Sequence, residues 1–121
     1  MKQLTKAEEE IMQVLWRLEK AFVKDIIEYL PEPKPAYNSV STIIRILEKK
    51  GVVGFEAFGK SHQYYPLIAK EEYTRKFMSR FVTNYFSGSY SNLVSFFAKE
   101  NNFEEDHIEL IQYLRAFKER F

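Results

Sequence analysis

The segment from Tyr37 to Gly51 constrains the fold of this chain more than any other part of it. Its apolar residues recur at the spacing of one helix face, and they are Val40, Ile43, Ile44 and Leu47. The opposite face carries polar and basic residues, namely Asn38, Ser39, Ser41, Thr42, Arg45 and Lys49. Gly51 is typical of the residue that follows a helix C-terminus. The pattern predicts an amphipathic helix with one face on a core and the other turned outwards.

Two helices are expected before this segment. Thr5 and Glu8 have the spacing of a capping box, which predicts that a first helix begins there. A second helix is expected over about residues 23–30, because Pro31 cannot continue it. The chain therefore reaches residue 51 with three helices.

A β-hairpin is expected directly after the third helix. Residues 53–65 alternate on both sides of a break at Gly59-Lys60-Ser61, which gives the hairpin a basic tip. Three helices followed by a hairpin are the order of a winged helix-turn-helix domain, which we place at residues 1–69. Residues 70–121 read as helical, so the predicted fold class is mainly α with a small β-hairpin.

The third helix is the predicted DNA-reading element, because the second helix of a helix-turn-helix pair enters the major groove. We expect Asn38, Ser39 and Thr42 to meet base edges, and Arg45 to bind guanine or phosphate. The phosphate-binding and neighbouring candidates are Lys34, Tyr37, Lys49 and Lys50, joined at the wing by Lys60 and Ser61, with His62 as a possible helper.

Charge supports this interpretation only locally. The chain has 18 Lys and Arg against 17 Asp and Glu, so its net charge of +1 says nothing about nucleic acid. Residues 34–60, however, hold five basic and two acidic side chains. Such a surplus favours phosphate contact, because each contact releases counterions.

The region at 70–121 is rich in aromatic residues and predicts a dimer interface. Twelve of the 20 aromatic residues follow Lys70, more than so short a stretch can easily bury within itself. The candidate dimerisation residues are Tyr73, Phe77, Phe81, Tyr85, Phe86 and Ile111. Two alternatives stay open, which are core packing within one chain and a small-molecule pocket lined by Tyr73, Phe77 and Tyr90.

Several function classes lack the residues that they need. The absence of cysteine removes disulfides, thiolate metal sites and cysteine catalysis. The two histidines lie far apart, and no glycine-rich phosphate loop or serine elbow occurs, so we expect no metal, no cofactor and no enzyme activity. The apolar runs are too short for membrane insertion, and the N-terminus lacks a signal-peptide core, which favours the cytoplasm.

Four segments together resemble the penicillinase and methicillin-resistance repressor family of BlaI/MecI type. They are LTKAEEEIMQVLW, YNSVSTIIRILEKKGVV, GKSHQYYP and FSGSYSNLVSFF, in this order. The resemblance implies a homodimeric repressor that binds palindromic double-stranded operator DNA. It also implies inactivation by proteolysis, triggered by a membrane-bound metalloprotease sensor. The matching cleavage position is Ser95-Phe96, where serine stands in place of the family's asparagine.

One other function class stays open at this point. A winged helix can serve as a protein-interaction module without touching DNA, since a fold does not fix a function. The near-neutral charge of the chain is compatible with that alternative.

Overall fold

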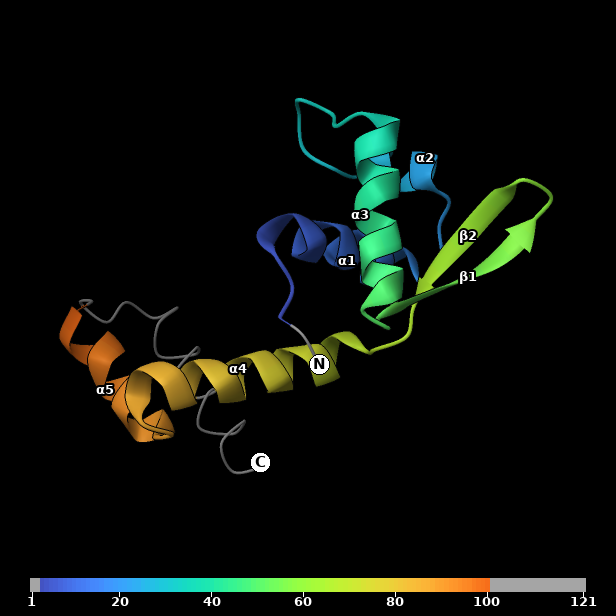
Figure 1. The fold of residues 1–121 in the computed structure, drawn as a ribbon. Helices are drawn as coiled ribbons and strands as arrows, with labels where there is room; N and C mark the ends of the chain where they lie inside the picture. The colour runs from blue at the N-terminus through green and yellow to red at the C-terminus, as the bar shows by residue number, and fades with distance from the viewer. Residues whose placement is uncertain (1–2, 101–121) are drawn as a thin grey trace. The chain divides into compact units, whose positions relative to one another are not determined.

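The structure is a computed structural model that describes residues 3–100 (Figure 1). Within these residues the elements are α1 (Lys6–Leu18), α2 (Val23–Glu28), α3 (Tyr37–Lys49), β1 (Val53–Phe58), β2 (Ser61–Pro66), α4 (Lys70–Phe86) and α5 (Tyr90–Glu100). The chain divides into two compact units, the first ending at Thr74 and the second beginning at Arg75. This division lies within α4, five residues beyond the predicted boundary.

Helix α1 begins at the predicted capping box. The Glu8 amide donates to the Thr5 hydroxyl at 3.2 Å, and the Thr5 amide donates to the Glu8 carboxylate at 2.9 Å. Both bonds satisfy amide groups that a helix start leaves without a partner. The buried face of α1 includes Ile11, Met12 and Leu15, which lie at the centre of the first unit's core.

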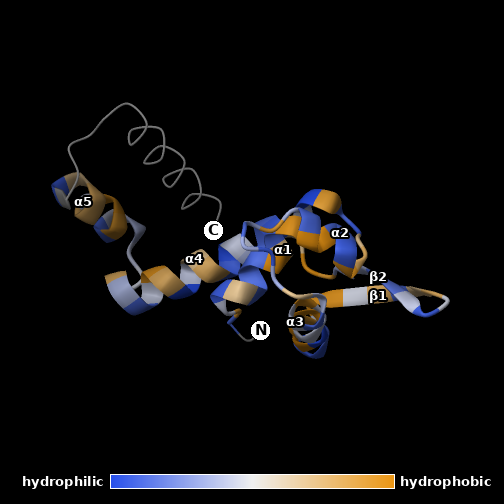
Figure 2. Ribbon diagram, turned by 90° about the horizontal axis from the view of Figure 1, so that it is seen from above, coloured by the Kyte–Doolittle hydropathy of each residue, from blue (hydrophilic) through white to orange (hydrophobic). Residues whose placement is uncertain are grey.

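Helix α3 packs on that core through Val40, Ile44 and Leu47, which are at most 1% exposed. It ends at Lys49, and Gly51 follows with a φ of 80°, the left-handed conformation that lets the chain turn after a helix. In Figure 2 the helix is seen nearly along its axis, with hydrophilic residues on the side turned away from α1 and α2. The predicted amphipathic helix is therefore confirmed.

Strands β1 and β2 form an antiparallel hairpin whose register runs from Val53↔Pro66 to Phe58↔Ser61. Gly59 and Lys60 make the turn, and Gly59 has a φ of 62°, which glycine adopts without steric cost. Ala21 adds one further bridge beside β2, exchanging both backbone hydrogen bonds with Tyr64 at 2.8 and 2.9 Å. A mainly helical fold with a small hairpin is what the sequence predicted.

The second unit is small in the part that the structure describes. Val82 of α4 and Leu93 of α5 are buried, and partly buried apolar side chains surround them. The chain breaks at Ser87-Gly88-Ser89 as predicted, and the Ser89 hydroxyl then caps α5 by accepting from the Asn92 amide at 3.1 Å. Ile111 and the last helix expected from the sequence lie outside the described residues.

Candidate nucleic-acid interface

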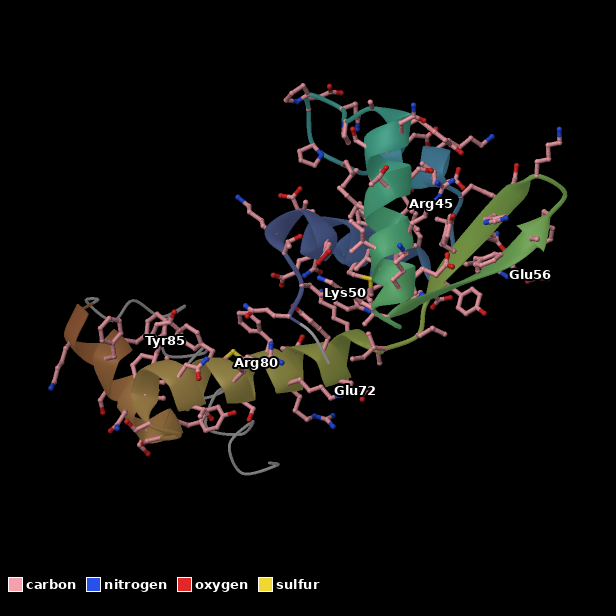
Figure 3. The ribbon with its side chains drawn as sticks, viewed as in Figure 1. Arg45, Lys50, Glu56, Glu72, Arg80 and Tyr85 are labelled. Atoms are coloured by element: carbon pink, nitrogen blue, oxygen red, sulfur yellow. The ribbon has the colours of Figure 1, made fainter. Side chains whose placement is uncertain are left out.

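The outward face of α3 is a continuous polar stripe. Asn38, Thr42, Arg45 and Lys49 follow one another at helical spacing, and all four are exposed, as is Ser39 beside them. Figure 3 shows Arg45 on this helix. The buried apolar side of α3 fixes the rotation of the helix about its axis, so the stripe cannot turn inwards. The structure thus places five predicted contact residues on one accessible surface, which we call the α3 face.

The side chains of the α3 face differ in the hydrogen-bonding groups and apolar surface that they present to a base edge. The Thr42 hydroxyl donates to the Asn38 carbonyl at 2.8 Å, so its lone pairs and its methyl group are what it presents outwards. Asn38 keeps an amide that can both donate and accept, as adenine recognition requires. Arg45 adds a planar donor fork that suits guanine or phosphate. Ile46, which sequence reasoning passed over, is 40% exposed next to Arg45 and adds an apolar surface.

Tyr64 of β2 belongs to the core of the first unit. This residue is 5% exposed, and burial raises the pKa of its phenol above 10.0. The charge of Glu48 raises that pKa further, and the charge of Arg45 lowers it.

The tip of the wing provides the second part of the interface. Lys60 and Ser61 are exposed at the turn and at the start of β2. His62 is half-buried, and its ring stacks on Phe55 with centroids 4.2 Å apart and planes 11° from parallel. The predicted wing candidates are therefore accessible to a ligand, whereas His62 is engaged by an aromatic neighbour.

Lys50, one of the predicted phosphate contacts, has a partner within the protein. Its ammonium donates to both oxygens of the Glu8 carboxylate, at 2.6 and 3.1 Å, and to the Gln3 carbonyl at 3.3 Å. Lys50 lies at the end of α3 (Figure 3), so the pair joins α3 to the start of α1. Nothing in the sequence pointed to this contact, because the two residues are 42 positions apart.

Two opposing effects set the pKa of the Glu8 carboxyl in this pair. Burial, the largest single effect, opposes ionisation, but the hydrogen bond and charge of Lys50 and the Thr5 amide outweigh it. The pKa of Glu8 is therefore below its ordinary value of 4.5, and Glu8 stays ionised in the folded protein. We therefore assign Lys50 a structural role as the partner of Glu8.

Lys34 likewise has a structural contact. Its ammonium donates to the carbonyl oxygens of Glu28 and Leu30, at 2.8 and 2.6 Å, where α2 ends. Cations are favourable at a helix C-terminus, because its last carbonyl groups lack partners within the helix. Tyr37, at the start of α3, is 58% exposed and accessible.

The predicted aromatic row does not act as one surface. Tyr73 is 6% exposed, and its ring lies 5.6 Å from that of Trp16 in the core of the first unit. Its role as a dimer contact is therefore corrected, because its own chain already covers it. Trp16 also donates its indole N–H to the Ile68 carbonyl at 2.9 Å. Tyr73 and the other two residues of the suggested small-molecule pocket belong to different units.

The remaining aromatic residues cluster in the second unit. Phe81 lies within 6.3 Å of Phe77, Tyr85 and Phe86, measured between ring centroids. Tyr85 is 72% exposed and Phe77 is 37% exposed. An aromatic cluster that keeps this much exposed surface is typical of an interaction site.

Two further features were sought in the part of the chain that the structure describes, a metal site and a membrane-spanning helix. Between residues 3 and 100, no three His, Asp or Glu side chains are grouped so that they could hold a metal ion. No helix in the same range is long and apolar enough to cross a bilayer.

Comparisons with known proteins identify the family of the chain. The family model described as penicillinase repressor matches residues 4–116. The methicillin resistance regulatory protein MecI of Staphylococcus aureus strain N315 is 28% identical over 108 residues, which is 88% of each chain. The penicillinase repressor of Bacillus licheniformis is 25% identical over 120 residues, covering 98% of this chain and 94% of that protein. The solution structure of the DNA-binding domain of the repressor BlaI is similar with a TM-score of 0.52 and 26% identity, covering 59% of this chain and 88% of that one. The chain therefore belongs to the penicillinase repressor family, a family of DNA-binding transcriptional repressors and not of enzymes.

Proposed function

We propose that this chain binds a palindromic operator as a homodimer and represses transcription of the adjacent genes. Each protomer inserts α3 into the major groove of one half-site and lays its wing along the DNA backbone. The observation that carries the proposal is the exposed α3 face, with Asn38, Thr42, Arg45 and Lys49 in one stripe above a buried apolar side. The names of the two relatives support target genes in β-lactam resistance.

In this proposal some residues of the interface contact base edges and provide specificity, and others contact phosphates and provide affinity. Asn38, Ser39 and Thr42 are small enough to bring α3 close to the bases, and their polar groups match base edges. Lys49 and Lys60 are point charges suited to phosphate, which positions the protein without reading sequence. Arg45 lies between these groups along α3. Its replacement should weaken operator binding more than any other, because the guanidinium can form two hydrogen bonds with one guanine.

The second unit supplies the dimer in this proposal. Its exposed aromatic residues on α4 and α5, which include Phe77, Tyr85 and Phe96, favour a second copy of the same surface as their cover. A dimer that spaces two α3 helices about one turn of DNA apart reads both halves of a palindrome. Binding then depends on dimerisation, because a single half-site contact is weak.

We propose that proteolysis of the repressor ends the repression of transcription. Ser95 and Phe96 are both exposed on α5, within the unit that we assign to dimerisation. A cut there would separate α4 from the end of the chain and weaken the dimer. A membrane-bound metalloprotease sensor is the expected trigger, and induced cells should then contain a fragment that ends at Ser95.

Titration of a labelled duplex from the region upstream of the gene tests the DNA-binding part. We expect Arg45→Ala to weaken binding about 10- to 100-fold, and Lys49→Ala to weaken it equally on specific and unspecific duplexes. Lys99→Ala is the matched control, because it removes the same charge from an exposed position on α5. Its Kd should stay within about twofold of the unmodified protein.

Two results would contradict the proposal. If no duplex from the upstream region bound more tightly than random DNA, the chain would be a winged-helix interaction module without a DNA ligand. If binding were specific but Arg45→Ala and Lys49→Ala left it unchanged, another surface would read the operator. Circular dichroism of each variant confirms that the fold is intact.

A further inference from the structure

The wing has a support near its tip that the DNA-binding proposal does not use. A two-stranded hairpin is only marginally stable by itself, and Lys60 lies at its far end in the turn. A lysine on a moving tip loses entropy when it settles on a phosphate, and that loss weakens the contact. The position of the tip is therefore relevant to affinity even though Lys60 is the contact residue.

The chain that precedes α2 is bound to the middle of β2. Ala21 and Tyr64 exchange two backbone hydrogen bonds, so this stretch acts as a short third strand beside β2. The next residue, Phe22, is the N-cap of α2, and its amide donates to the Asp25 carboxylate at 3.0 Å. Phe22 is thus held in place by α2 on one side and by the wing on the other.

The Phe22 side chain then reaches the outer end of the hairpin. Its ring meets that of Phe58 edge to face, with centroids 6.0 Å apart and planes at 67°. Phe58 forms the last cross-strand pair before the turn, opposite Ser61, and is 51% exposed. Edge-to-face geometry at this distance is favourable for two aromatic rings.

We propose that Phe22 and Phe58 form an anchor that holds the wing tip where Lys60 can meet the DNA backbone. Both are positioning residues that act through Lys60, and neither reads a base. The anchor rests on the proposed operator binding, and it adds that the wing is preorganised by α2. Removing either aromatic ring should therefore change operator affinity and its salt dependence in the same way as removing Lys60.

Operator titrations of the full chain at several salt concentrations test the anchor. We expect Phe58→Ala to weaken binding about three- to tenfold, and to reduce the slope of log K against log salt by about one per protomer, as Lys60→Ala does. The double variant Phe58→Ala/Lys60→Ala should bind no more than about twofold more weakly than Lys60→Ala alone, because both changes remove the same contact. Phe58→Tyr, which keeps the ring, should restore both affinity and slope.

Three outcomes would overturn the anchor. They are an unchanged affinity in Phe58→Ala, a loss of affinity with an unchanged salt slope, and additive losses in the double variant. Because Phe58 is half-exposed, its replacement leaves the core of the first unit intact, and thermal unfolding of the variant verifies this. Arg45→Ala is measured alongside: if it binds normally, the proposed function fails, and if it alone is weak, only the anchor fails.

Discussion

Replacing Lys50 with methionine removes the partner of a buried carboxylate and keeps most of the volume of the side chain. Glu8 is 4% exposed, and the Lys50 ammonium lies 2.6 and 3.1 Å from its two oxygens. Breaking a fully buried ion pair on one side costs about 3–5 kcal/mol. The Lys50 side chain is 17% exposed and water can reach it, so we expect Lys50→Met to lower the free energy of unfolding by about 2 kcal/mol.

A double-mutant cycle separates the pair from other effects. Glu8→Gln removes the charge but keeps an acceptor for the Thr5 amide. It should lower the free energy of unfolding by about 1 kcal/mol. The double variant Glu8→Gln/Lys50→Met leaves no buried charge without a partner. Its loss should be smaller than the sum of the single losses by about 1 kcal/mol or more.

The pH dependence has a defined sign. The pKa of Glu8 is lower in the folded protein than its ordinary value of 4.5, so Glu8 stabilises the fold at pH values above 4.5. This contribution is lost as the pH falls below 4.5 and through the lowered pKa. The stability difference between the unmodified chain and Glu8→Gln should therefore be constant above about pH 5.5 and shrink below 4.5.

Urea unfolding followed by Trp16 fluorescence measures these differences, because Trp16 is the one tryptophan of the chain and lies in the first unit. Operator titrations of the same variants provide the refuting experiment. If Lys50→Met left the unfolding free energy unchanged but reduced the salt slope of DNA binding by about one per protomer, Lys50 would be a phosphate ligand. The assignment of Lys50 to the fold would then be wrong.

Three further predictions concern other contacts. Trp16→Phe should lower the free energy of unfolding by about 1 kcal/mol, because the hydrogen bond to the Ile68 carbonyl is lost; thermal and urea unfolding measure this. Tyr85→Asp should shift the protein towards the monomer in sedimentation experiments and weaken operator binding at least about tenfold. Thr83→Asp, which adds the same charge at an exposed position away from the aromatic rows of α4, should do neither. With Lys49 and Lys60 of two protomers on phosphates, log K should fall against log salt with a slope of about −4, and a slope near zero would rule out these contacts.

The local features of the fold could be predicted from the sequence, because local signals set them. The capping box at Thr5 and Glu8, the apolar period of α3 and the turn at Gly59 each depend on residues a few positions apart. The α3 face followed from the same reasoning, since a buried stripe on one side of a helix leaves the other side exposed.

Contacts between distant parts of the chain could not be predicted in this way. Nothing local indicates that Lys50 meets Glu8, which is 42 positions away. The spacing of the aromatic residues favoured one continuous face on α4, but Trp16 from α1 covers Tyr73. For Lys50 and Tyr73, a residue from a distant part of the chain contacts a side chain that the sequence had suggested for DNA or for a second copy.

DNA cleavage by a reagent attached to α3 tests whether this helix lies against the operator. The chain has no cysteine, so Ser39→Cys creates a single site for attaching an iron chelate, and Gln13→Cys on the exposed side of α1 provides the control. We predict cuts within both operator half-sites from the chelate at position 39, and none above background from position 13. Operator cleavage from position 13, with none from position 39, would show that α3 does not face the DNA.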